Sequence, residues 1–264
     1  SSDLNLDKPW VTENINQIFC IANDDYWHTA FKNFLYSSPI IRPIYELLKK
    51  HKHYQKALDF NFDDEQAIRS LVNHISISYL EGVGDLNDPD SLINKLINQG
   101  DELKILSLID FFGSQRHNVS DKIITRIKPL WESVYARINK DFSTNASLKA
   151  LTVSWLPLVE VIDDDIFEWL KMAFESLNNS CPFDYIEDLL KHADSTPDKV
   201  GDLYLCMLKN DFYPILYKEK IISLLRKLLV SSAKEKAKEI SNMYLNKGHF
   251  FTKEIIEEAK NLPH

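Results

Sequence analysis

Glycine and proline are scarce in this sequence, which has six Gly and ten Pro in 264 residues. Sandwiches and barrels need many glycines in their turns, and no stretch here combines alternating apolar residues with a hairpin turn. Hydrophobic residues make up 44% of the chain, enough to form a substantial core. The sequence therefore predicts an all-α protein with long helices and short loops.

Cysteine and long apolar runs are lacking as well. Cys20, Cys181 and Cys206 are far apart and form no CxxC pair, so we expect neither a disulfide framework nor a zinc site. We interpret all three as small apolar core residues in a reducing compartment. No stretch approaches the roughly 18 apolar residues of a membrane span, and residues 1–10 do not resemble a signal peptide. We expect a cytoplasmic protein that does not enter the membrane.

The common catalytic motifs are absent. The sequence has no phosphate-binding or dinucleotide-binding glycine loop, no GxSxG elbow and no HExxH pair. His51 and His53 are two residues apart, which places them on different faces of a helix and makes them poor metal ligands. The three acids at 163–165 are explained more simply as a helix cap than as a magnesium site. We therefore predict no cofactor, no metal and no enzymatic activity.

One spacing does resemble a catalytic motif. Arg69 and His74 lie on one predicted helix with four residues between them, and this pattern resembles the motif of HEPN ribonucleases. In that family the Arg and His meet across a dimer and act on the 2′-hydroxyl and phosphate of RNA. Both residues also flank an apolar stripe that includes Ile68 and Ile75, which is typical of a packed histidine beside an arginine with a buried stem. A HEPN-type ribonuclease is therefore an alternative to a non-enzymatic protein.

Charge is distributed unevenly. The formal charge is −8, which argues against a general affinity for nucleic acid. Residues 1–208 contain 20 basic and 32 acidic residues, whereas residues 209–264 contain 11 and 7. The basic end either docks an acidic neighbour or, as is usual for charge runs, forms solvated helix faces. Its lysines include Lys218, Lys220, Lys227, Lys234, Lys236 and Lys238.

Helical periodicity is clearest over 63–81, where Ile68, Leu71 and Ile75 share a face behind Asp63 as a predicted N-cap. Gly82 then favours a turn with positive φ. Similar patterns predict helices over 13–22, 25–37, 41–58, 64–81, 89–98, 101–112, 121–139, 145–156, 165–178, 182–193, 197–209, 217–230, 232–247 and 252–260.

Paired helices begin at intervals of roughly 35 to 44 residues, within the range of helical hairpin repeats. No tetratricopeptide or ankyrin signature is present. We therefore expect an α-solenoid of stacked hairpins, either HEAT-like or tetratricopeptide-like, that forms a single repeat domain over 1–264 and belongs to a longer protein.

Several segments resemble the C-terminal helical region of large bacterial STAND-type NTPases and related anti-phage defence proteins. The resemblance involves packing and turn residues and covers most of the chain after residue 45. The residues are His53, Tyr54, Ala57, Leu58, Phe62 to Glu65, Tyr79 to Gly82, Leu130, Trp131, Glu132, Arg137, Trp155, and Asn246 to Phe250.

This resemblance implies that NTPase and effector modules precede the present chain and that the chain senses a target. The expected partner is then a protein, either a phage protein or the adjoining NTPase module. A solenoid is suited to this role because it offers a long binding surface and little chemistry. A structural scaffold or oligomerisation arm is the other alternative.

Overall fold

The computed structural model describes residues 8–37, 40–177 and 185–261, and these residues contain helices and turns but no strand. The all-α prediction is confirmed for them. The chain divides into two compact units, Ser1–Phe111 and Phe112–His264, which we call unit 1 and unit 2 and describe separately.

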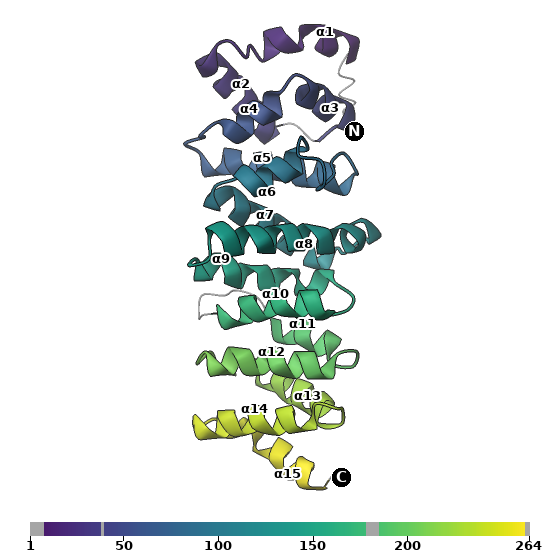
Figure 1. The fold of residues 1–264 in the computed structure, drawn as a ribbon, viewed down its shortest axis with the longest axis vertical. Helices are drawn as coiled ribbons and strands as arrows, with labels where there is room; N and C mark the ends of the chain where they lie inside the picture. Colours follow the sequence, from purple (N-terminus) through teal and green to yellow (C-terminus); the bar gives the residue numbers. More distant parts are fainter. Residues whose placement is uncertain (1–7, 38–39, 178–184, 262–264) are drawn as a thin grey trace. The chain divides into compact units, whose positions relative to one another are not determined.

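Unit 1 is built around α5, which contacts α2, α4 and α6. An aromatic cluster fills its interior. The Trp27 and Phe31 rings stack with centroids 5.2 Å apart, and the ring of Tyr54 meets Phe31 edge-on at 5.5 Å. The helices of unit 1, labelled in Figure 1, are α1 (Lys8–Ile18), α2 (Asp24–Ser37), α3 (Arg42–Lys50), α4 (His53–Asp59), α5 (Glu65–Leu80), α6 (Leu92–Gln99) and most of α7 (Glu102–Ser114).

Several predicted boundaries in unit 1 are wrong. The helix predicted over 13–22 is α1, which begins five residues earlier and ends four residues earlier, at Lys8–Ile18. The helix predicted over 41–58 is broken at Lys52, which takes a left-handed conformation with φ 63° and separates α3 from α4. Asp64, rather than Asp63, caps α5, because its carboxylate accepts the backbone N–H of Gln66 at 3.0 Å. The turn after α5 follows the prediction, since Gly82 has φ 78°.

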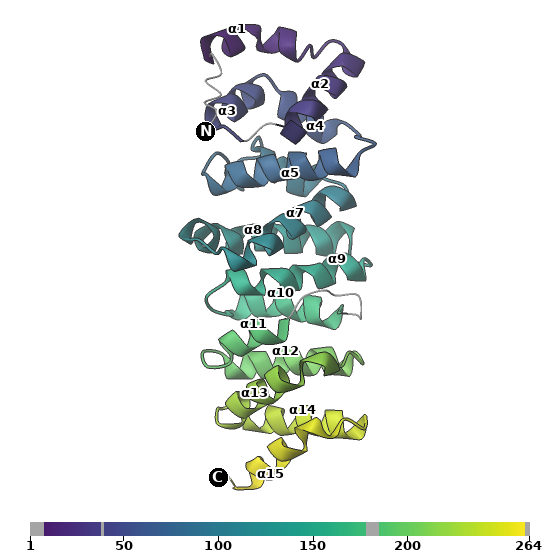
Figure 2. The same cartoon turned by 180° about the vertical axis from the view of Figure 1, so that it is seen from behind.

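Unit 2 contains two sets of helices in which each helix contacts the next member of its own set. One set is α10, α12 and α14, seen in Figure 1, and the other is α11, α13 and α15, seen in Figure 2. The elements of unit 2 after α7 are η1 (Gln115–His117), α8 (Asp121–Asp141), α9 (Ala146–Leu151), η2 (Thr152–Leu158), α10 (Asp164–Glu175), α11 (Tyr185–His192), α12 (Pro197–Lys209), η3 (Ile215–Tyr217), α13 (Lys218–Leu229), α14 (Lys234–Asn246), η4 (Phe250–Thr252) and α15 (Lys253–Asn261), the η elements being 3₁₀ turns.

Lysines of unit 2 link each pair of helices to the pair before it. Lys220 of α13 binds Glu187 of α11 at 2.8 Å, and Lys227 binds Asp194. In the other set, Lys236 of α14 binds Asp202 of α12 at 2.8 Å. The basic end of the sequence thus docks an acidic neighbour that belongs to the same chain, and these lysines are not simply solvated.

The tryptophans and cysteines differ in how far they are buried. Trp27, Trp131 and Trp155 are fully buried, whereas Trp10 is 55% exposed. Cys20 and Cys206 are half-buried rather than core residues, and Cys181 lies outside the described residues. Burial raises the pKa of the Cys206 thiol.

Candidate protein-binding surface

The sequence singled out Arg69 and His74, and the structure gives them separate partners on α5. The Arg69 guanidinium binds the carboxylates of Glu65 at 2.8 Å and Asp110 at 3.1 Å. The Nδ1 atom of His74 lies 2.8 Å from the Tyr54 hydroxyl, and its ring meets Phe34 edge-on at 5.7 Å. His74 is therefore part of the aromatic core of unit 1, while Arg69 belongs to a surface ion-pair network.

The protonation of these residues agrees with their surroundings. His74 is only 4% exposed, and burial lowers its pKa to about 4. The hydrogen bonds that the Arg69 guanidinium donates to the carboxylates of Glu65 and Asp110 raise the pKa of Arg69. Neutral His74 shares a hydrogen bond with the Tyr54 hydroxyl through Nδ1, and a side chain that is only 4% exposed offers an RNA-sized substrate little access.

His51 and His53 also have different environments. His53 is fully buried, and its Nδ1 accepts a hydrogen bond from Trp27 Nε1 at 3.1 Å. Burial lowers the pKa of His53 to about 4. His51 is half-buried, and its Nδ1 lies 3.1 Å from the Asn16 side-chain oxygen. His53 is thus a packing residue of the core, and His51 makes a contact between helices.

The acids at 163–165 cap α10, as predicted. The Asp163 carboxylate accepts the backbone N–H of Ile166 at 3.0 Å. It also binds Lys128 at 2.6 Å, and Lys128 contacts Asp165 at 3.1 Å. A lysine therefore occupies the position between these carboxylates where a cation would bind.

A buried ion pair in unit 2 was not predicted from the sequence. The Asp188 carboxylate is 1% exposed and binds Arg116 at 2.7 Å and Lys191 at 3.1 Å. Burial raises the pKa of Asp188, and the two cations oppose this shift. Arg116 and Asp188 lie far apart in the sequence and belong to no motif, so no sequence signal points to the pair. It ties η1 to α11 in the interior.

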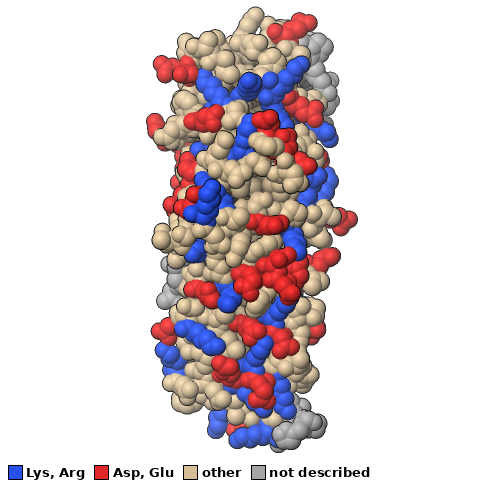
Figure 3. All heavy atoms as spheres, viewed as in Figure 1, with Lys and Arg blue, Asp and Glu red and all other residues tan. Residues whose placement is uncertain are grey.

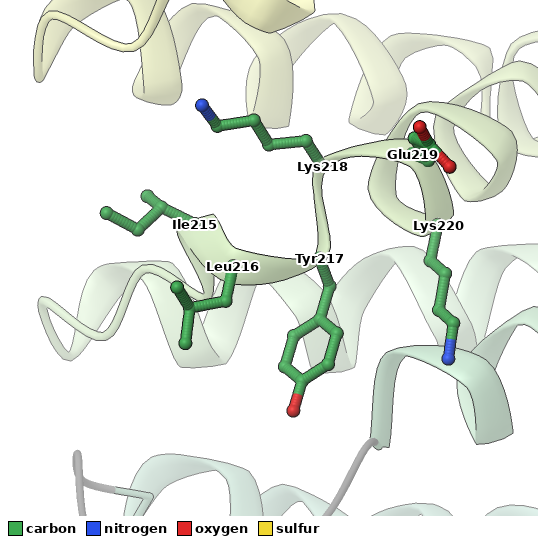
Figure 4. A pocket seen from close by; sticks show the side chains of 6 residues that line it. All are labelled: Ile215, Leu216, Tyr217, Lys218, Glu219 and Lys220. Atoms are coloured by element: carbon green, nitrogen blue, oxygen red, sulfur yellow. The ribbon is translucent and has the colours of Figure 1, made fainter.

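The most exposed apolar residue of unit 2 lies in the turn before α13. Leu216 is 88% exposed and Ile215 is 40% exposed. They line a pocket of about 480 Å³ together with Tyr217 and the first residues of α13 (Figure 4). Leu216 and Tyr217 project to the same side of the turn, away from Lys218. Three consecutive apolar residues thus border one pocket, and it is a contiguous exposed apolar patch, not a single side chain, that marks an interaction site.

A second exposed apolar residue lies in the neighbouring turn. Phe250, the first residue of η4, is 71% exposed. The Lys218 ammonium lies 5.9 Å from the ring centroid of the adjacent Phe251, which brings the two turns together at the N-terminal end of α13. In the described part of the chain, Lys218 forms no ion pair. We call the surface formed by Ile215, Leu216 and Tyr217 the η3 surface; Phe250 is exposed in the neighbouring turn, which contacts α13.

The sequence contains a weak signal for the η3 surface. Three consecutive apolar residues follow Pro214. The last of them, Tyr217, falls within the helix predicted over 217–230, so the pattern does not indicate that the three form one exposed segment. Amphipathic periodicity assigns apolar residues to the core, so it could not indicate that a 3₁₀ turn before α13 places Leu216 outside.

Within the described residues, no group of three or more His, Cys, Asp or Glu side chains is arranged to hold a metal ion. No helix in the same residues has both the length and the apolar character needed to cross a bilayer. Comparisons of the chain with protein-family models, curated proteins and solved structures found no match.

Proposed function

We propose that the chain is a non-enzymatic protein-recognition module, an α-solenoid of stacked helical hairpins. In unit 2 the contacts of α10 with α12 and of α11 with α13 support such stacking. Ion pairs between consecutive pairs of helices support it too, because their partners lie one hairpin apart, as in Glu187 with Lys220. HEAT-like or tetratricopeptide-like repeats have this pattern of nearest-neighbour contacts.

The exposure of Leu216 is the observation that carries the protein-binding role. Burying an aliphatic side chain of this size contributes about 1.5 to 3 kcal/mol, which a partner that covers Leu216 would gain on binding. Tyr217, which lines the same pocket, is of the aromatic type that protein interfaces favour. The η3 surface therefore has the composition of a small binding site for a protein segment.

The resemblance to STAND-type NTPases suggests where such binding is used. In this proposal the chain senses a target protein for a bacterial anti-phage defence NTPase, and the η3 surface belongs to the sensing region. The target is a phage protein or the NTPase module itself. The chain binds it in the cytoplasm without a cofactor.

The test is selection of a peptide-display library on the purified chain, followed by measurement of peptide affinity by fluorescence anisotropy. We expect enriched peptides with apolar anchors, and we expect Leu216→Asp to weaken their binding by at least about tenfold, the loss of roughly 1.4 kcal/mol. Val230→Asp is the matched control, because Val230 is 75% exposed at the opposite end of α13. Equal effects of the two variants, or no enrichment, would contradict the proposed site.

A further inference from the structure

Four lysines lie within eight residues at the corner between α3 and α4. They are Lys49, Lys50, Lys52 and Lys56, and no acidic residue occurs between Glu46 and Asp59. This run is unusual for its surroundings, because residues 1–111 contain only ten basic residues against 17 acidic ones. The cations of an acidic unit are thus concentrated at a single corner, and Figure 3 shows Lys and Arg side chains gathered over α4.

Three of these lysines have no carboxylate partner among the residues that the structure describes. Lys56 is neutralised, because its ammonium binds Asp24 at 2.5 Å and lies 4.6 Å from the centroid of the Trp27 ring. Lys49, Lys50 and Lys52 form no ion pair in the described part of the chain, and Lys50 and Lys52 are exposed. We call these three residues the basic corner.

Local structure accounts for only part of this concentration. Lys49 and Lys50 lie in the last turn of α3, where a cation is favoured by the helix dipole by about 0.3 to 1 kcal/mol. Lys52 lies beyond the helix in a left-handed conformation, where asparagine or glycine would be less strained. The dipole also does not explain why, within residues 8–37, 40–177 and 185–261, no acid of another helix pairs with these ammonium groups, as acids do with Lys220 and Lys236 of unit 2.

The corner is held in place by the preceding helices. His51 lies between Lys50 and Lys52, and its Nδ1 meets the side-chain oxygen of Asn16 on α1 at 3.1 Å. The Lys56 ammonium also donates to the backbone carbonyl of Ile21 at 2.8 Å. Ile21 itself is 43% exposed, so an apolar side chain lies close to the lysine run.

We propose that the basic corner binds an acidic protein segment that carries an apolar anchor. Opposite charge supplies the attraction to Lys49, Lys50 and Lys52, and Ile21, whose carbonyl accepts a hydrogen bond from Lys56, offers an exposed apolar side chain at the end of the lysine run.

A short acidic segment fits this corner better than a nucleic acid does. Unit 1 has a formal charge of −7, which repels a long polyanion. Screening confines the field of the corner to about 8 to 10 Å at physiological ionic strength, the scale of a short peptide contact. The inference does not depend on the η3 surface, which lies in unit 2.

The test measures the binding of a short fluorescein-labelled Glu/Leu peptide to the full chain by fluorescence anisotropy. A single-stranded RNA of equal charge is measured in parallel. We expect the peptide to bind more tightly than the RNA, and the affinity to fall as salt is raised to about 0.3 M. Lys49→Glu/Lys50→Glu/Lys52→Glu should raise the peptide Kd by at least about tenfold, mainly through slower association and faster loss of the complex.

The matched control has the same change in net charge at three separate positions of unit 2, Lys140→Glu/Lys171→Glu/Lys260→Glu. It should change the Kd by less than about twofold, as should Leu216→Asp. Equal weakening by both triple variants, tighter binding of RNA, or no peptide binding at about 1 mM would overturn the proposal. If circular dichroism shows that the first triple variant is unfolded, the corresponding glutamine variant replaces it, with the same expectations.

Discussion

At the scale of single residues, histidines show how strongly burial decides chemical role. His53 and His74 come from different helices, yet both lie in the aromatic interior of unit 1, where His53 accepts a hydrogen bond from Trp27 and His74 shares one with the Tyr54 hydroxyl. Their folded-state pKa values of about 4 lie below the ordinary value of about 6.5. The unfolded chain therefore binds more protons than the folded chain between these two values.

It follows that unit 1 loses stability as the pH falls from about 6.5 to 4, and that the contribution of the two histidines is complete above this window. From pH 7.5 to 5 we expect each histidine to remove about 2 kcal/mol from the free energy of unfolding. Urea titrations at both pH values measure the loss in the wild type and in His74→Gln, where glutamine can still accept the Tyr54 hydroxyl. The loss should be smaller in the variant by about 2 kcal/mol, and equal losses would contradict the buried, neutral state of His74.

At the scale of secondary-structure elements, α7 is apolar on more than one face. A substitution at its end therefore tests whether the buried interior of unit 2 begins at this helix. Phe112 is fully buried, and its ring meets the buried Trp155 ring edge-on at 5.6 Å. Phe112→Ala should lower the free energy of unfolding by about 3 to 5 kcal/mol, because it removes a buried aromatic ring and leaves a cavity. Urea titration followed by circular dichroism measures this loss.

The control for Phe112→Ala is Val230→Ala, which removes an apolar side chain that is 75% exposed and should cost less than about 0.5 kcal/mol. Hydrogen exchange should also show η2 and its neighbours affected before α14, since stacked helices lose stability mainly through adjacent contacts. A loss below about 1 kcal/mol for Phe112→Ala would show that α7 is not an interior helix at this residue.

The elements also show what the sequence could and could not predict. Helix type follows from apolar periodicity, which is why the 64–81 prediction agrees with α5 to within a residue at each end. The break at Lys52 could not be predicted, because it requires a lysine in a left-handed conformation and no glycine or proline marks it. Tertiary partners were also hidden, since nothing local to Lys227 indicates Asp194.

The candidate surfaces follow the same division. The lysine run of the basic corner is visible in the sequence, but its lack of carboxylate partners among the described residues depends on how the helices pack. Leu216 is indistinguishable from a core leucine until the η3 turn is known. The pairing of Arg69 with Asp110 likewise depends on the contact between two helices. The sequence thus indicates which residues are candidates for binding, and only the structure shows which of them are exposed or unpaired.

At the scale of the whole molecule, the proposed binding role predicts that the purified chain neither hydrolyses nucleoside triphosphates nor cleaves RNA. The sequence lacks a phosphate-binding loop, and His74, the general acid or base of the ribonuclease alternative, is 4% exposed with Tyr54 on its Nδ1. Incubation with single-stranded RNA, transfer RNA and labelled ATP, followed by gel electrophoresis and phosphate release, tests both activities. We expect no product above the buffer control.

If the chain does cleave RNA, two variants of α5 show whether Arg69 and His74 are responsible. Arg69→Gln changes a half-exposed guanidinium that would stabilise charge in the ribonuclease, and it should leave the fold intact because surface ion pairs contribute only about 0 to 1 kcal/mol. His74→Gln changes the proposed acid or base in the core. RNA cleavage that is lost in both variants, while circular dichroism shows wild-type helicity in each, would establish the ribonuclease and refute the non-enzymatic proposal. Cleavage that persists in both would instead assign the activity to a contaminant or to residues outside this pair, since a HEPN-type mechanism requires the two side chains together.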